Sequence, residues 1–496
     1  MSPTVLCPAL EDEKSDEETP VNTGVSSANF RVRNRRRSPE FTPVVMAAGC
    51  GSQMFELSHD RAGKTPKCML PVANTPMIWY SVNFLIANKF EEIFVVVRQG
   101  DKDVIESYLT SSVRKLELDV HIEYVCIDDD ADLGTADSLR IVAPKTKSDL
   151  LVISSDLITK VSLSELANVH RANNAALTAL VAPRYSPPTP DGRRKRNKKD
   201  DRDFIGLDPE DDRILFIANE KDIEDEISIK RGQLTRFPHM RLHTNLLDSH
   251  LYLVSRTTLS MLDNHPDVSM MRCELLPLLV RKQIKQIVNT NYTVFADRIY
   301  SKKQDIDEDS KHPDEYFDIL SEPESVGCYV HHTDSFTVRV NQLHNYIKYN
   351  KAVSENMDDI IPKNDVETCD ISKMTQVGKC SRLGNSVKIA EKCSFKRSFI
   401  GNRVQIGPHC KIVDTVIMDD VTIEDNVSLT NCIVCKGVVI KNKCTLKDSR
   451  ICDGFEVASG SDYVGESLVA DSEIPNMMSF SIYNSGRGSD AEDLSK

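Results

Sequence analysis

Aliphatic residues recur every six positions over residues 375–463, and this repeat constrains the fold more than any other feature of the sequence. They form three rows: Val377, Leu383, Ile389 and Phe395; Ile400, Ile406 and Ile412; and Val421, Val427, Ile433 and Val439. Six is neither the period of an α-helix nor that of a strand. It fits a coil of three short strands per turn, in which each strand adds one aliphatic side chain to a central stack. The sequence therefore predicts a β-helix of hexapeptide repeats.

Residues 41–350 follow a different pattern, in which short apolar runs alternate with amphipathic segments. We expect strands at 44–48, 93–97, 121–127, 150–154 and 176–181, and helices at 77–88, 101–110, 135–142 and 163–173. Strands that are almost continuously Val, Ile and Leu are typical of a parallel sheet covered by helices on both faces. The pattern predicts a Rossmann-like α/β domain, whose ligand would bind beyond the carboxyl ends of the strands.

The remaining segments are polar. Residues 1–40 contain the basic run Arg31–Arg37, which is either a nuclear-import or nucleic-acid patch or, as we favour, part of a solvated tail. The segments near 184–203 and 301–325 cannot bury enough apolar surface to offset chain entropy, so we expect mobile insertions there. Residues 351–374 are interpreted as a linker, and residues 464–496 as an acidic disordered tail.

Composition narrows the class of protein. The formal net charge is −13, which argues against direct nucleic-acid binding driven by phosphate neutralisation. The 14 cysteines lack the spacing of a disulfide scaffold, so we expect reduced thiols. The N-terminus lacks the pattern of a signal peptide, and no apolar run reaches the ~18 residues needed to span a bilayer. A cytosolic protein without a membrane partner is expected.

The first expected strand leads into a loop of small residues that contains Gly49, Gly51 and Ser52. Glycines allow backbone N–H groups to surround an anion, although a Gly-x-Gly alone is weak evidence. Here Lys67 follows in the stretch 64–77 and supplies a cation suited to phosphate. The loop therefore indicates a phosphate-binding site.

Together, these motifs resemble the signature of the sugar-nucleotide pyrophosphorylases, which are nucleotidyltransferases. Two further segments match. Gly134 and Thr135 lie in a Leu-Gly-Thr-Ala segment, which in that family contacts the nucleobase and sugar. Asp156 follows a buried strand at the position of the family's Mg²⁺-binding aspartate. From its local sequence alone, Asp156 fits equally well as the N-cap of a helix that starts at Leu157.

Three departures from the family pattern remove catalytic features. Gln53 replaces the arginine of the glycine loop, Asp137 replaces a glycine, and Ser155 replaces the glycine before the aspartate. Loss of one transition-state cation can cost about 3 kcal/mol of transition-state stabilisation. We therefore expect no catalytic residue. The candidate residues form at most a vestigial nucleotide pocket, with nucleotide and Mg²⁺ as optional ligands and no required cofactor.

Two other motifs carry little chemical signal. Cys432 and Cys435 form a CxxC inside the repeat, but no second pair lies at zinc spacing, so we favour structural filler over metal or redox chemistry. His331 and His332 have no metal-binding residues near them in the sequence, and we interpret them as part of a strand. We expect no metal site.

Several longer stretches, at 69–80, 129–140, 157–159, 202–206 and 274–283, resemble the gamma subunits of eukaryotic translation initiation factor 2B. This resemblance, over about residues 41–465, implies a non-catalytic pyrophosphorylase-like domain and a left-handed β-helix. It implies pairing with the epsilon subunit within a multi-subunit guanine nucleotide exchange factor whose substrate is initiation factor 2. The exchange-catalysing helical domain of that family is on epsilon, and we expect none here. The alternative is an active pyrophosphorylase such as a mannose-1-phosphate guanylyltransferase.

Overall fold

The computed structural model describes residues 39–49, 54, 57, 65–184, 203–286, 326–357 and 369–469, except 118, 130, 132, 221, 222, 224, 225, 230, 373 and 379. The expected terminal tails, most of both insertions and the basic run lie outside this part of the chain. Among the described residues, no helix is long and apolar enough to cross a membrane.

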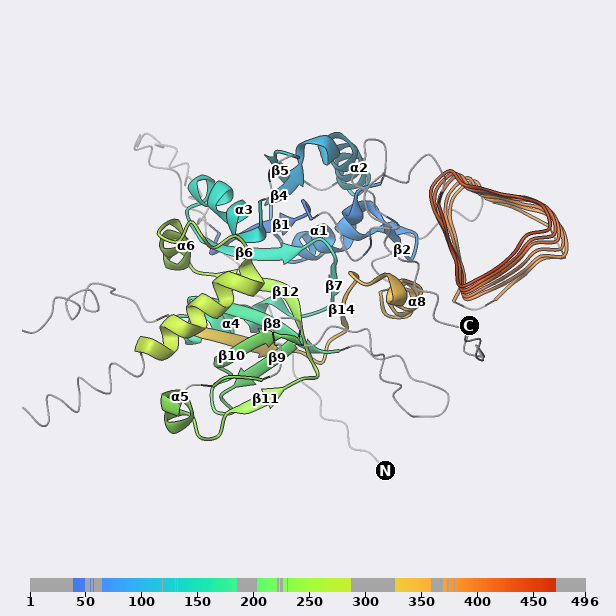
Figure 1. Cartoon of the computed structure of the whole chain (residues 1–496). Helices are drawn as coiled ribbons and strands as arrows, with labels where there is room; N and C mark the ends of the chain where they lie inside the picture. The colour runs from blue at the N-terminus through green and yellow to red at the C-terminus, as the bar shows by residue number, and fades with distance from the viewer. Residues whose placement is uncertain are drawn as a thin grey trace, which may run out of the picture. The chain divides into compact units, whose positions relative to one another are not determined.

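A seven-stranded sheet forms the centre of the first domain (Figure 1). Its order is β13 (Cys328–His332), β8 (Leu177–Pro183), β12 (Leu246–Val254), β6 (Asp149–Ser154), β1 (Phe41–Met46), β4 (Glu92–Arg98) and β5 (His121–Ile127). The five strands expected from the sequence are present. The expected all-parallel sheet is wrong in one respect, because β12 runs antiparallel to both β6 and β8. Its sequence, with Asp248, Ser249 and His250 inside it, lacks the continuous apolar run that marked the other strands.

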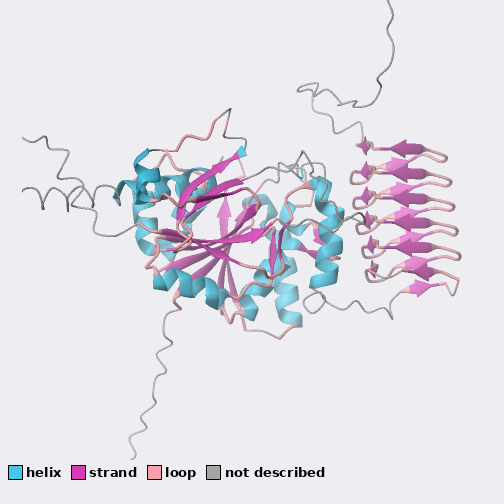
Figure 2. Ribbon diagram, turned by 90° about the horizontal axis from the view of Figure 1, so that it is seen from below, coloured by secondary structure: helices cyan, strands magenta, loops and turns pink. Residues whose placement is uncertain are grey.

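Helices cover both faces of this sheet (Figures 1 and 2). One apolar core packs the sheet against α3 (Thr135–Val142), α6 (Arg256–Asp263) and the helical residues 276–286. The other packs it against α1 (Met77–Ala87), α2 (Lys102–Lys115) and α4 (Leu163–Ala172), and includes Trp79. The four helices expected from the sequence therefore form, and the doubly covered α/β architecture is confirmed.

Smaller elements complete this domain. A second sheet has the order β10 (Ile214–Asn219), β9 (Asp203–Leu207) and β11 (Arg241–His243). The short strand β7 (Leu157–Thr159) pairs antiparallel with β14 (Thr337–Arg339), and β2 (Pro71–Val72) pairs with β3 (Thr75–Pro76). The short helices are η2 (Lys67–Met69), η3 (Gln99–Asp101), η4 (Ala143–Lys145), α5 (Arg231–Arg236), η6 (Met271–Leu275) and η8 (Leu343–Asn345).

Residues 370–468 form the expected β-helix, whose stacked coils are seen end-on in Figure 1 and from the side in Figure 2. Three parallel sheets have the orders β15-β18-β21-β24-β27-β30, β16-β19-β22-β25-β28-β31 and β17-β20-β23-β26-β29-β32. The strands are β15 (Asp370–Ile371), β16 (Gln376–Val377), β17 (Arg382–Leu383), β18 (Lys388–Ile389), β19 (Ser394–Lys396), β20 (Phe399–Ile400), β21 (Gln405–Ile406), β22 (Lys411–Val413), β23 (Val416–Ile417), β24 (Thr422–Ile423), β25 (Ser428–Thr430), β26 (Ile433–Val434), β27 (Val439–Ile440), β28 (Thr445–Lys447), β29 (Arg450–Ile451), β30 (Glu456–Val457), β31 (Asp462–Val464) and β32 (Ser467–Leu468). The last coil thus extends past the expected end at residue 463.

The third predicted row of the repeat is partly wrong. The first coil has the 18 residues of a strict six-residue repeat, since Asp370 pairs with Lys388 and Gln376 with Ser394. In the coils that follow, equivalent positions such as Arg397 and Asp414 are 17 residues apart, so one face of each of these turns is a residue shorter. Val421 and Val427 are buried in the core. Ile433 instead packs outside the coil, and Val439 is only half-buried, because a row of strict sixes loses phase at the short face.

The corners of the coils bring many residues other than glycine into the left-handed backbone region. Arg397, Arg403, Asp414 and Asn431 are examples, with φ values between 49° and 56°. Stacked corner side chains compensate, since Arg397 donates from Nε to Asp414 Oδ1 at 2.5 Å in the next coil. The corners therefore do not depend on glycine alone.

A further apolar cluster joins the two domains through α8 (Tyr346–Asn356). Its members from the first domain include Tyr80, Ile158, Tyr346 and Val353, and those from the β-helix are Phe399, Val416, Met418, Ile433 and Cys435. Asn74 Nδ2 donates to Ile400 O at 2.7 Å across the same joint. Residues 351–356, expected to begin a linker, are helical because α8 has this apolar surface to cover.

Candidate functional site

The carboxyl ends of β1 and β6 lie side by side and position two of the candidate residues. Met46 is in register with Ser154, and Ser155 N donates to Met46 O at 3.0 Å. Gly49 therefore follows β1 at the same sheet edge at which Asp156 follows β6. Gly51, Ser52 and the departure Gln53 lie outside the described residues.

Asp156 is buried and bound by two cations. Its Oδ2 accepts from Lys67 Nζ at 2.7 Å, and its Oδ1 accepts from Arg339 Nε at 3.1 Å and from Ser154 Oγ at 2.6 Å. Burial alone would raise the pKa of Asp156, but Arg339 and Lys67 outweigh it and hold the pKa well below its ordinary value. The carboxylate is therefore ionised and its charge is neutralised within the protein.

The pairing of β7 with β14 brings Arg339 close to Asp156. Lys67 begins η2, and Arg339 ends β14, where it is in register with Leu157 of β7. The helix-cap interpretation of Asp156 is thus wrong, because Leu157 begins a strand whose backbone needs a partner strand and not a cap. Of the candidates from the sequence, Lys67 and Asp156 are brought into direct contact.

His250 extends this cluster into β12. Arg339 donates from a terminal nitrogen to His250 Nε2 at 2.8 Å. His250 has a φ of 55° at an irregularity in the pairing of β12 with β8 between Asp248 and Tyr252. Burial and the neighbouring Arg339 lower the pKa of His250 to about 3, so the ring is neutral and can accept this bond.

A second buried carboxylate, Asp248, is also paired. It accepts from the Tyr252 hydroxyl, and its Oδ2 lies 3.6 Å from Arg272 Nε. Arg272 also binds Asp203, which accepts from Asn219 Nδ2 at 3.0 Å. Burial would raise the pKa of Asp248, but His250 and Arg272 lower it overall. This edge of the domain thus holds alternating acidic and basic groups that satisfy one another.

The arrangement does not fit a Mg²⁺ site. Mg²⁺ takes carboxylate, water and phosphate oxygens in octahedral geometry. Both oxygens of Asp156 are occupied by donors, and Asp248 is bound by Tyr252 and Arg272. Among the described residues, no group of three or more His, Cys, Asp or Glu side chains could hold a metal ion.

The start of α3, where Gly134 and Thr135 were expected to contact a nucleobase, is closed by the segment 269–271. Ala136 N donates to Ser269 O at 2.8 Å, and Met271 N donates to Thr135 Oγ1 at 2.9 Å. A Cβ atom on Gly134 would lie 2.1 Å from Ser269 O, so only glycine allows this approach. The free N–H groups of a helix start are what would bind a polar ligand, and here backbone and side-chain acceptors use them.

Asp137 is part of the same closure. Its Oδ2 accepts from Gly134 N at 3.0 Å, which is the bond from the third helical residue back to the N-cap, and from Ser269 Oγ at 2.7 Å, while Arg140 pairs with Oδ1. The departure from glycine at this position therefore has a structural explanation. Its carboxylate caps the helix and ties it to residue 269.

Sequence reasoning missed Arg339, His250, Asp248, Arg272 and Ser269. The first four carry one available signal, which is a charged or polar side chain within or beside an otherwise apolar segment. Several of their partners are distant in the sequence, however, and Arg339 lies 183 positions after Asp156. No local pattern pairs such distant residues.

The CxxC and the histidine pair do not form sites in the described part of the chain. Cys432 lies in the interior of the β-helix and Cys435 in the joint cluster, so the two thiols, which flank β26, belong to different apolar cores. This agrees with the filler interpretation. His331 and His332 are in β13, as expected, and each approaches one carboxylate, Glu165 at 3.7 Å and Asp212 at 3.5 Å.

Known families match both parts of the chain. The nucleotidyl transferase model matches residues 42–192, and the eIF2B subunit epsilon LbH domain model, a left-handed β-helix, matches residues 364–463.

Among individual proteins, the chain is similar to translation initiation factor eIF2B subunit gamma of three organisms. That of Dictyostelium discoideum is 26% identical over 72% of this chain and 87% of that protein, and that of Schizosaccharomyces pombe is 25% identical over 68% and 70%. That of Caenorhabditis elegans is 28% identical over 50% of this chain, which spans 59% of the worm protein. Mannose-1-phosphate guanyltransferases, such as that of Candida albicans, match only 29% of this chain. The chain is thus a homologue of the gamma subunits of eIF2B, composed of a nucleotidyltransferase domain and a left-handed β-helix.

Proposed function

We propose that this chain is a subunit of the eIF2B guanine nucleotide exchange factor and has no transferase activity of its own. The pairing of Asp156 with Lys67 and Arg339 carries the proposal, since it uses internally the charges that a nucleotidyltransferase directs at phosphate and metal. The closed start of α3 supports it, as does the similarity to three eIF2B gamma subunits.

In this role the chain pairs with the epsilon subunit, and the complex exchanges GDP for GTP on initiation factor 2 during translation initiation. The matching epsilon LbH model and the similarity to epsilon subunits support this choice of first partner. We further propose that the chain acts in the cytosol and requires no cofactor. Any nucleotide or Mg²⁺ at the Gly49–Asp156 edge would first have to displace Lys67 and Arg339 from Asp156.

Affinity purification of the tagged full chain from its own cells tests the assembly. The expected result is recovery of the other eIF2B subunits, with epsilon in equal amount. The purified complex should release GDP from initiation factor 2, and release should fall when this chain is depleted. Recovery of the chain without any eIF2B subunit would contradict the proposal.

A separate assay tests the alternative, an active sugar-nucleotide pyrophosphorylase, which the match of residues 42–192 to the nucleotidyl transferase model favours. Pyrophosphate release is measured with a panel of nucleoside triphosphates, sugar phosphates and Mg²⁺. We expect no turnover above a no-protein control. Turnover that is lost in Lys67→Gln, but kept in a variant of the exposed Lys102, would establish the enzyme instead.

A further inference from the structure

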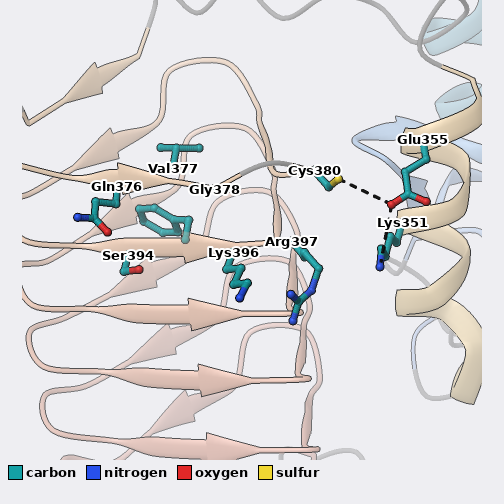
Figure 3. Close-up of a pocket in the computed structure, with 10 residues that line it drawn as sticks. Lys351, Glu355, Gln376, Val377, Gly378, Cys380, Ser394, Lys396 and Arg397 are labelled. Atoms are coloured by element: carbon teal, nitrogen blue, oxygen red, sulfur yellow. Dashed lines mark hydrogen bonds and ion pairs between the residues drawn. The ribbon is translucent and has the colours of Figure 1, made fainter. Parts of the chain in front are cut away.

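An open cleft lies between α8 and the first coils of the β-helix (Figure 3). None of the residues of the Asp156 cluster lines it. Its volume is about 560 Å³, within the ~300–1,000 Å³ range of small-molecule sites. Helix α8 contributes Lys351 and Glu355, and the β-helix contributes the remaining lining residues: Gln376, Val377, Gly378, Cys380, Ser394, Phe395, Lys396 and Arg397.

The cleft is locally basic although the chain has a formal net charge of −13. Three cations line it, Lys351, Lys396 and Arg397, against the single carboxylate of Glu355. Lys396 makes no ion pair with any described residue. Lys351 Nζ lies 4.0 Å from Glu355, and both side chains are more than 40% exposed, so this pair is weak.

The Arg397 side chain is fixed by Asp414 of the next coil. Its Nε and one terminal nitrogen bind the two oxygens of Asp414 in the next coil, which fixes the plane of the guanidinium. Its other terminal nitrogen makes no hydrogen bond with a described residue. Arg397 therefore presents a fixed donor beside the two lysines, and Figure 3 shows Arg397 and Lys351 on facing sides of the gap.

Neutral donors and a close coil contact complete the wall. Ser394 and Gln376 lie on the outward face of adjacent strands, in register with each other. Gly378 N donates to Phe395 O at 2.8 Å, and a Cβ atom on Gly378 would lie 2.8 Å from that same oxygen. The first two coils can approach this closely only with glycine there, which leaves the wall free of a side chain.

We propose that this cleft binds a phosphate-bearing small molecule that bridges α8 and the β-helix. A phosphate group accepts several charge-assisted hydrogen bonds at once, and ammonium and guanidinium donors line this cleft from two elements, with hydroxyl and amide groups farther along the β-helix wall. The volume exceeds that of one phosphate and leaves room for a second group, such as another phosphate. The site is separate from the Lys67–Asp156 edge and does not depend on the proposed role in eIF2B.

Calorimetric titration of the full chain, in its complex where it purifies as one, with inorganic pyrophosphate at physiological ionic strength tests the proposal. Saturable binding is expected. Lys396→Gln and Lys351→Gln should each weaken it about tenfold, the equivalent of one charge-assisted hydrogen bond. Both lysines are peripheral to the folded cores, so these variants should fold normally, as checked by circular dichroism.

Lys447→Gln is the matched control, because Lys447 is exposed in the same outward row three coils away. It should bind pyrophosphate as the unaltered chain does, and so should Lys67→Gln. An equal loss in Lys447→Gln would reveal only general surface charge, and a loss confined to Lys67→Gln would move the site to the Asp156 edge. No saturable binding at millimolar pyrophosphate, or Lys396-dependent binding of an acidic peptide alone, would also overturn the proposal.

Discussion

At the scale of single residues, the Asp156 carboxylate decides what the end of β6 can do. It is almost fully buried, and it is satisfied by Lys67, Arg339 and Ser154. Its negative charge is already neutralised by two cations of the protein, and a metal ion would have to displace them. The position of Asp156 after β6 suggests a metal-binding residue of an enzyme. Its contacts with Lys67, Arg339 and Ser154 make it part of the structural core instead.

Asp156→Asn should destabilise the fold strongly. The substitution leaves the partly buried cations Lys67 and Arg339 without their counter-charge, and breaking a buried pair in this way costs about 3–5 kcal/mol. The free energy of unfolding from urea denaturation measures the effect. Glu106→Gln removes an exposed partner of Lys102 and should cost at most about 1 kcal/mol. Equal effects of the two substitutions would refute a structural role for Asp156.

His250 predicts a pH dependence. Burial and Arg339 lower the pKa of this ring to about 3 in the folded protein, whereas an unfolded histidine titrates near 6.5. Between these values the unfolded state binds the proton and the folded state does not, so the stability from His250 is complete above pH ~6.5 and falls as the pH drops toward 3.

Urea denaturation at several pH values measures this loss. In His250→Asn, which tolerates the positive φ, the decline between pH 6.5 and 4 should become shallower. An unchanged slope would contradict a neutral buried ring. His409→Asn is a suitable control, because His409 also has a positive φ but lies at a corner of the β-helix.

At the scale of elements, hydrogen-bond geometry sets which side chains of the β-helix face inward. Backbone hydrogen bonds join each coil to the next, and after the first coil one short face gives a coil of 17 residues. The phase of the apolar rows must follow the coil, because every strand has to keep its partner in register. Hydrogen bonding also explains the start of helix α3, where the backbone N–H groups donate to Asp137 and to the carbonyl of Ser269.

Two neighbouring residues of β27, Val439 and Ile440, distinguish the observed coil from a strict six-residue repeat, because only one of them can face the interior. Ile440 is fully buried in the coil interior, whereas Val439, the residue of the predicted row, is half-buried on the outside. Ile440→Ala should reduce the free energy of unfolding by about 2–5 kcal/mol. Val439→Ala should cost less than ~1 kcal/mol, by the same denaturation measurement. A larger effect at Val439 would support the strict six-residue phase.

At the scale of the whole molecule, the outer face of one β-helix sheet is apolar and covered. Phe399, Val416 and Ile433 lie there in one cluster with Tyr346 and Val353 of α8. Such a joint couples the unfolding of the two domains, because neither can lose its structure without exposing the shared surface.

Ile433→Lys should uncouple the domains. A charge in this cluster costs free energy that only separation of the two surfaces relieves, so calorimetry should show two unfolding transitions where the unaltered chain shows one. Val439→Lys, on a half-exposed position of another sheet, should keep the single transition. Coupled unfolding of Ile433→Lys would mean that the joint contributes little.

The sequence by itself determined the two architectures. A core that repeats every few residues leaves its period in the sequence, so the α/β segments and most of the coil rows were predictable from local spacing. Resemblance to a known family identified Gly49, Lys67, Gly134, Thr135 and Asp156 as candidates. The antiparallel β12 was not predictable in this way, because its polar residues hide the strand pattern.

Only the tertiary structure decided how those candidates are used. Lys67 and Asp156 are 89 residues apart, and Arg339 and Asp156 are 183 residues apart, so their pairing leaves no local spacing to detect. The same holds for Ser269, whose carbonyl closes the start of α3. Local periodicity reflects backbone geometry, whereas the balance of buried charges depends on which distant segments the fold brings together.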